Sequence, residues 1–81
     1  MEEESFITPT QDEIKMAFVA SCIEDVAREL NRPYIEVFER MDKVNMLDNY
    51  IHLHYDTLHT ESRRNLTHSL IETLNRWENG E

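Results

Sequence analysis

Asp48, His52 and Asp56 are the residues of this chain whose types and spacing come closest to a reactive site. They are four residues apart, so in a helix they share one face, and a carboxylate–imidazole–carboxylate row can hold a divalent metal. Three ligands on one exposed helix face leave the coordination sphere incomplete, and the chain has no His-Glu-x-x-His sequence. The pattern therefore favours a solvated polar face, and we predict neither a metal site nor a cofactor.

The sequence also shows no clear pair of a nucleophile and a general base for catalysis. Cys22, the single cysteine, sits among apolar residues at helical spacing, which predicts a buried and unreactive thiol. His59 and Thr60 stand where one helical pattern ends and another begins, and such residues usually satisfy backbone groups at helix ends. We therefore predict no catalytic residue and do not expect an enzyme.

The elements that carry these residues are expected to be helices. Apolar residues recur every three or four positions, and one glycine and two prolines leave little from which to build hairpins. The fold class is therefore all-α, a compact bundle of four helices in which the second is short. The pattern breaks place these helices at residues 8–30, 33–41, 46–57 and 61–77. Around them we expect a flexible acidic lead-in at 1–7, a single domain at 8–78 and a tail at 79–81.

Two helix starts have sequence signals for a cap. At the first helix, Thr8 with Gln11 and Thr10 with Glu13 both fit a capping box, and the sequence leaves the choice open. Thr60 is expected to cap the fourth helix.

The charge of the chain restricts its partners. Eight basic residues face 17 acidic ones, which gives a net charge of −9, and the basic residues do not cluster beyond Arg63-Arg64. Direct binding to nucleic acid or to an anionic membrane is therefore disfavoured, whereas a basic protein partner is favoured. The sequence shows no signal peptide, and its longest apolar stretch, Met16–Ala20, is too short to span a bilayer. The expected compartment is the cytoplasm.

Aromatic and methionine side chains near the second helix form the candidate contact surface. Tyr34, Phe38, Met41 and Met46 lie on this helix or just after it, and Met with aromatic residues can make an adaptable binding patch. The same composition also suits a plain hydrophobic core, so both interpretations stay open.

Several short motifs resemble a known family, the domain-of-unknown-function family 3791 of small bacterial proteins. They are Cys22-Ile23-Glu24, Ala27-Arg28-Glu29-Leu30, Pro33 with Val37-Phe38, and Tyr55-Asp56-Thr57-Leu58-His59-Thr60. The resemblance covers roughly residues 18–74 and assigns no catalytic residue. In its most specific motif, Tyr55, Leu58, His59 and Thr60 are expected to be structural.

The chain departs from the family pattern at two loops. Asn31 stands where the family usually has a glycine. Asn45-Met46-Leu47 stands where the family often has a glycine or a hydrophobic pair. These departures affect the expected loop geometry and not the resemblance itself.

The resemblance also implies a functional context. Members of the family are often encoded beside proteins that resemble ADP-ribosyltransferase toxins, which implies an antitoxin-like or cognate-partner role. Together with size and charge, this favours a small acidic protein-binding module. Two alternatives stay open: a structural homo-oligomer, such as a homodimer closed by the same patch, and a phage-type inhibitor whose carboxylates imitate nucleic-acid phosphates.

Overall fold

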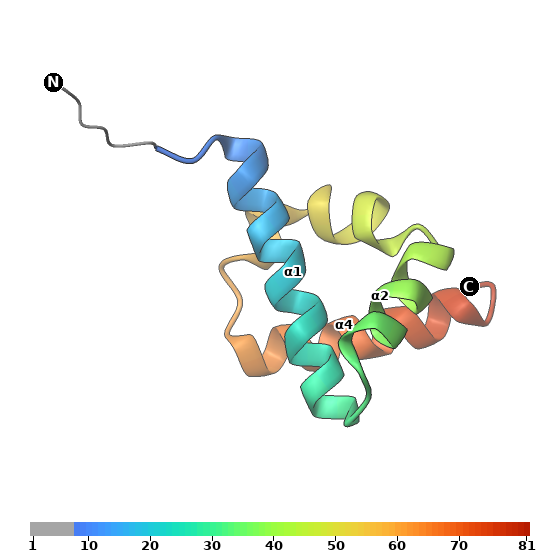
Figure 1. The fold of residues 1–81 in the computed structure, drawn as a ribbon. Helices are drawn as coiled ribbons and strands as arrows, with labels where there is room; N and C mark the ends of the chain where they lie inside the picture. The colour runs from blue at the N-terminus through green and yellow to red at the C-terminus, as the bar shows by residue number, and fades with distance from the viewer. Residues whose placement is uncertain (1–7) are drawn as a thin grey trace, which may run out of the picture.

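The computed structural model describes residues 8–81, and every regular element within them is helical (Figure 1). The all-α prediction is therefore confirmed, but residues 8–81 contain five helices and not four. In chain order the elements are α1 (Gln11–Leu30), α2 (Tyr34–Lys43), η1 (Leu47–His52), α3 (Tyr55–Leu58) and α4 (Arg63–Glu78). The predicted lead-in at 1–7 lies outside the described residues.

Helix α1 begins with the second of the two capping boxes that the sequence allowed. The Glu13 amide donates to Thr10 Oγ1 at 3.1 Å, and the Thr10 amide donates to Glu13 Oε1 at 2.8 Å. The helix ends at Asn31, whose φ of 56° is left-handed, and the Arg32 amide then donates to the Ala27 carbonyl at 2.9 Å. Asn31 thus supplies the backbone conformation for which glycine is usually chosen.

Helix α2 begins one residue later and ends two residues later than expected. Pro33 occupies the N-cap and not the first helical position, and the helix continues to Lys43 instead of stopping at Met41. Asn45, with a φ of 62°, then turns the chain towards η1.

The third predicted helix is split in two, which accounts for the fifth element. Residues Leu47–His52 form a π-helix, two turn residues follow, and α3 starts at Tyr55. A π-helix closes its hydrogen bonds five residues apart, so the following side chains rotate away from the positions an α-helix would give them. His54 lies in the turn between η1 and α3 and is exposed.

The start of α4 also differs from the prediction. Ser62 is the N-cap, and its side chain accepts a hydrogen bond from the Asn65 amide at 3.2 Å. Thr60 instead donates its hydroxyl proton to the Thr57 carbonyl at 2.7 Å, at the end of α3. The hydroxyl therefore closes the preceding helix and does not open the next.

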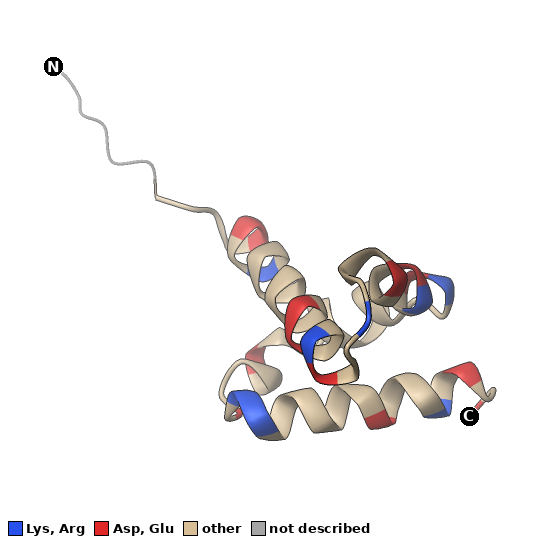
Figure 2. Cartoon of the chain, turned by 60° about the horizontal axis from the view of Figure 1, so that its bottom comes forward, with Lys and Arg blue, Asp and Glu red and all other residues tan. Residues whose placement is uncertain are grey.

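The hydrophobic core lies where α1 packs against α2, η1 and α4, and α4 crosses the C-terminal half of α1 (Figures 1 and 2). As predicted, α1 and α4 contribute stripes at helical spacing. The buried apolar residues are Cys22, Ile23, Val26, Ala27, Val37, Met41, Met46, Ile51, Leu58, Leu66, Leu70 and Leu74.

Two arginine–carboxylate pairs connect segments that are distant in sequence. Arg63 at the start of α4 donates to both carboxylate oxygens of Asp25 at 2.7–3.1 Å, and Arg28 donates to the same carboxylate at 3.0 Å. Burial alone would raise the pKa of Asp25, but the hydrogen bonds from Arg63 and Arg28 outweigh it, and the pKa is lowered from its ordinary value of 3.8. Arg40 of α2 likewise holds Glu78 at 2.8 Å through two hydrogen bonds.

Candidate protein-binding groove

The structure separates the three residues of the Asp48–His52–Asp56 row. Because η1 ends at His52 and a turn precedes α3, the regular four-residue spacing of one helix face is lost. His52 Nε2 instead lies 3.3 Å from Asp12 Oδ1 of α1. Between residues 8 and 81 there is no group of three His, Cys, Asp or Glu side chains arranged to hold a metal ion.

The Cys22 thiol is inside the core. Burial, together with the nearby charge of Asp25, raises its pKa to about 12, so the thiolate is scarce at neutral pH. This environment does not suit a nucleophile.

The motif Tyr55–Thr60, which precedes α4, makes packing contacts. Leu58 is buried, the Tyr55 and His59 rings stack with centroids 4.5 Å apart, and Phe18 of α1 meets Tyr55 edge-on at 5.2 Å. The Thr60 hydroxyl donates a hydrogen bond to the α3 backbone. The motif therefore stabilises the end of α3, and its Tyr55 ring packs α3 against α1.

The contact patch predicted around α2 requires correction. Met41 and Met46 are 0% exposed and belong to the core, so they cannot form a surface. Met41 points inward because α1 covers that side of α2, and Met46, which directly precedes η1, lies in the same core cluster. Phe38 is partly buried against the core, and Tyr34 is 44% exposed. Only these two of the four predicted residues are accessible to a partner.

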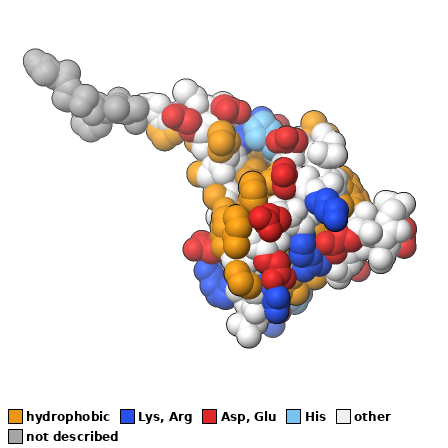
Figure 3. All heavy atoms as spheres, turned by 45° about the vertical axis from the view of Figure 1, so that its right-hand side comes forward, with side chains coloured by type: hydrophobic (Ala, Val, Ile, Leu, Met, Phe, Trp, Pro, Cys, Tyr) orange, Lys and Arg blue, Asp and Glu red, His pale blue; other side chains and the backbone are white. Residues whose placement is uncertain are grey.

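A different apolar surface lies between α1, α2 and η1. A groove of about 180 Å³ is lined by Met16, Val19, Phe38, Leu47, Asp48 and His52. This volume is below the range of ordinary small-molecule sites and suits one or two side chains of another protein. Figure 3 shows hydrophobic side chains gathered in a band on one side of the molecule, with both acidic and basic side chains beside them.

The groove exists because the apolar stripe of α1 is longer than the core that covers it. Met16, Val19, Ile23 and Val26 follow one another at three- and four-residue spacing, so they lie on one side of the helix. Val26 is buried by α2 and α4, whereas Met16, two to three turns earlier, is 61% exposed. The stripe therefore continues past the point where residues 8–81 supply atoms to pack against it.

Helix α2 extends the apolar surface. Ile35 and Tyr34 precede Phe38 by three and four residues, so they are its neighbours on the helix surface, and Ile35 is 59% exposed. Exposed aliphatic side chains next to a partly filled groove are typical of an interaction surface.

The charges around the groove are mainly negative. Asp48 lines it, and Asp12 lies beside it through its contact with His52. The nearest α1 cation, Lys15, is directed over the Tyr55 ring, with Nζ 5.9 Å from the ring centroid. An apolar floor with an acidic edge is complementary to a partner with apolar and basic side chains.

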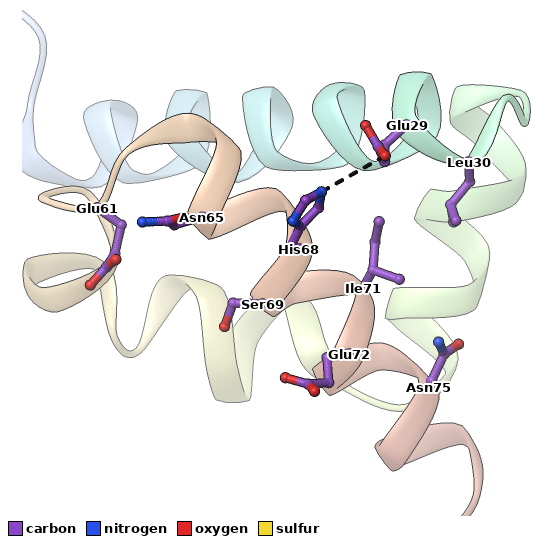
Figure 4. A pocket seen from close by; sticks show the side chains of 9 residues that line it. All are labelled: Glu29, Leu30, Glu61, Asn65, His68, Ser69, Ile71, Glu72 and Asn75. Carbon is purple, nitrogen blue, oxygen red and sulfur yellow. Dashed lines mark ion pairs between the residues drawn. The ribbon is translucent and has the colours of Figure 1, made fainter.

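A larger hollow of about 860 Å³ lies along α4 beside the C-terminal end of α1, but its side chains do not converge on one point (Figure 4). His68 is directed towards Glu29 of α1 and Asn65 towards Glu61, whereas Ser69 and Glu72 point elsewhere, and Leu30 and Ile71 give the hollow a small apolar part. The spread of these groups does not form a catalytic arrangement.

Sequence reasoning missed Met16, Ile35 and Leu47 as surface residues. The three- and four-residue spacing that links Met16 to Val19 and Ile23 was available as a signal. What the spacing does not reveal is how far along the stripe the other helices reach.

The comparisons with known proteins give a family and no characterised relative. Residues 17–77 match the model of a family described as protein of unknown function (DUF3791), which includes Val19, Phe38 and Leu47 of the groove and excludes Met16. Neither the curated proteins nor the solved structures contain a match. In the part of the chain that the structure describes, no helix has the length and apolar character needed to cross a membrane. The match spans most of the sequence and confirms the resemblance seen in its motifs, so this chain belongs to the DUF3791 family of proteins of unknown function.

Proposed function

We propose that the protein is a small acidic binding module whose α1–α2–η1 groove receives apolar side chains from a basic protein. The observation that carries the proposal is Met16: it continues a core stripe, yet 61% of it is exposed. Covering this side chain and its neighbours supplies the apolar contact, since burying a side chain of this size is worth about 1.5–3 kcal/mol.

The acidic character of the chain supports a basic partner and argues against self-association at this surface. Two copies meeting at the groove would bring the Asp48 and Asp12 carboxylates of both molecules together. A basic partner would instead be attracted before contact, and its association would slow as salt rises. In the context that the family resemblance implies, this partner is an ADP-ribosyltransferase-like protein, which the module neutralises by covering its surface.

The test is calorimetric titration of the ADP-ribosyltransferase-like protein from the same genome with three forms of this chain: wild type, Met16→Ser and Leu53→Ser. Leu53 is a matched control because it is 67% exposed but does not line the groove. We expect Met16→Ser to weaken binding at least tenfold and Leu53→Ser to change it by less than twofold.

Two outcomes would contradict the proposal. Equal losses from both substitutions would show that binding does not involve the groove. Retained binding in Met16→Ser, with loss after neutralising surface carboxylates, would favour the phosphate-mimic alternative.

A further inference from the structure

The exposed face of α4 carries both basic and acidic side chains. Arg64, His68 and Glu72 follow one another at four-residue spacing and are all exposed, so they form one row along the helix. The row is basic at one end and acidic at the other. It is therefore locally balanced, although the chain as a whole is strongly acidic.

The charged ends of this row are poorly satisfied within the chain. Arg64 makes no ion pair with any of residues 8–81, and Glu72 reaches only Arg76, at 4.0 Å. At the centre of the row, His68 Nε2 is 3.8 Å from Glu29 Oε2 of α1 (Figure 4). Both ends of the row remain available to another molecule.

The arrangement is symmetric about His68. Arg64 and Glu72 are four residues to either side of it, and Asn65 and Ile71 are three to either side. If a second α4 lies antiparallel with His68 at the crossing point, each Arg64 faces the partner's Glu72. Such self-complementarity is the requirement for a two-fold interface, in which the same surface is used by both copies.

We propose that a second copy of this chain docks antiparallel along α4, so that a two-fold axis passes beside His68. The hollow lined by Leu30 and Ile71 then supplies the apolar part of the interface. The groove between α1, α2 and η1 is on another surface and stays open, so this dimer is independent of the proposed function.

The expected dimer is weak. The row is exposed, so its two ion pairs are partly screened, and one helix face of about 20 Å gives an interface at the small end of the range for specific complexes. We expect a dissociation constant on the order of 100 µM at low salt, which increases with ionic strength.

Charge reversal provides a decisive experiment. In Arg64→Glu both ends of the row on α4 are acidic, and in Glu72→Arg both ends are basic. Two copies of the same variant would therefore place like charges opposite each other. A mixture of the two restores both ion pairs between unlike chains. By sedimentation velocity at concentrations up to about 1 mM, we expect wild type to dimerise, each variant alone to dimerise at least tenfold more weakly, and the equimolar mixture to dimerise like wild type.

Two controls separate this surface from other causes. Lys43→Glu changes the net charge as much as Arg64→Glu does, but lies on α2, and should leave dimerisation unchanged. Met16→Ser should also leave it unchanged, whereas self-association through the groove would be lost in that variant. A monomeric wild type, variants that still dimerise alone, or a mixture that stays monomeric would each overturn the proposal. Circular dichroism establishes that each variant is folded.

Discussion

Replacing Met46 by alanine tests whether this residue belongs to the core or to a surface. The sequence allowed Met46 to be part of a contact patch, but the structure buries it completely among the residues that α1, α2 and η1 bring together. If Met46 were on the surface, replacing it by alanine would leave the unfolding free energy nearly unchanged. If it is in the core, the same substitution should lower the unfolding free energy substantially.

The magnitude follows from the burial. Truncating a fully buried methionine to alanine costs about 2–5 kcal/mol, which includes the lost transfer energy and the cavity. Met41, a flexible neighbour in the same cluster, can move into part of that space, so we expect about 2–3.5 kcal/mol. In a domain of this size, such a loss lowers the melting temperature by roughly 10–25 °C. It is also a large fraction of the total stability, which for 81 residues is about 4–12 kcal/mol.

The assay is urea unfolding followed by circular dichroism, with two comparisons. Met46→Leu keeps the volume and should cost less than about 1.5 kcal/mol. Met16→Ala removes the same atoms from an exposed position and should change the unfolding free energy by no more than about 0.5 kcal/mol. If Met46→Ala costs less than about 1 kcal/mol, or if Met16→Ala costs as much as Met46→Ala, the assignment of these two methionines to core and surface is refuted.

Three further predictions concern single residues. Because the pKa of Asp25 is lower in the folded protein than its ordinary value of 3.8, its ion pair adds stability above that pH and loses it as the pH falls below. The difference in unfolding free energy between wild type and Asp25→Asn should thus stay constant from pH 7 to about 5 and shrink towards pH 3, and a difference that grows in acid would contradict this. The Cys22 thiol, buried and with its pKa raised to about 12, should not react with a disulfide reagent at pH 8 until the protein is unfolded in guanidinium. Asn31→Gly should leave the stability within about 0.5 kcal/mol, whereas Asn31→Val should lower it by about 1–2 kcal/mol because a β-branched residue opposes a φ of 56°, and equal urea midpoints for the two would refute the role of the left-handed cap.

The apolar stripes of α1 and α4 and the N-terminal cap of α1 were accessible to sequence reasoning, whereas the cap of α4 was not. The α1 stripe appears in the residue spacing, and the Thr10–Glu13 box was one of two caps that the sequence allowed. Such features depend on residues within one or two turns of each other, so a single helix contains the information. The break after η1 was not accessible, because the residues of Leu47–His52 also fit an ordinary α-helix.

The candidate site was predicted less well than the fold, because the sequence does not show which side chains the other helices cover. Tyr34 and Phe38 were placed on an accessible part of α2, while Met41 and Met46, chosen by the same reasoning, are in the core. Residue type does not distinguish these cases, since methionine and aromatic side chains serve cores and interfaces equally.

The amino-acid sequence by itself determined that this protein is helical, acidic and a member of its family, because periodicity, composition and short motifs are properties of the chain before it folds. Only the tertiary structure decided which part of the α1 stripe is covered. That depends on where α2, η1 and α4 cross it, and these crossings leave Met16 in solvent and Met46 in the core. The long-range pairs from Arg63 to Asp25 and from Arg40 to Glu78 arise in the same way, since each joins residues 38 positions apart that no local pattern brings together.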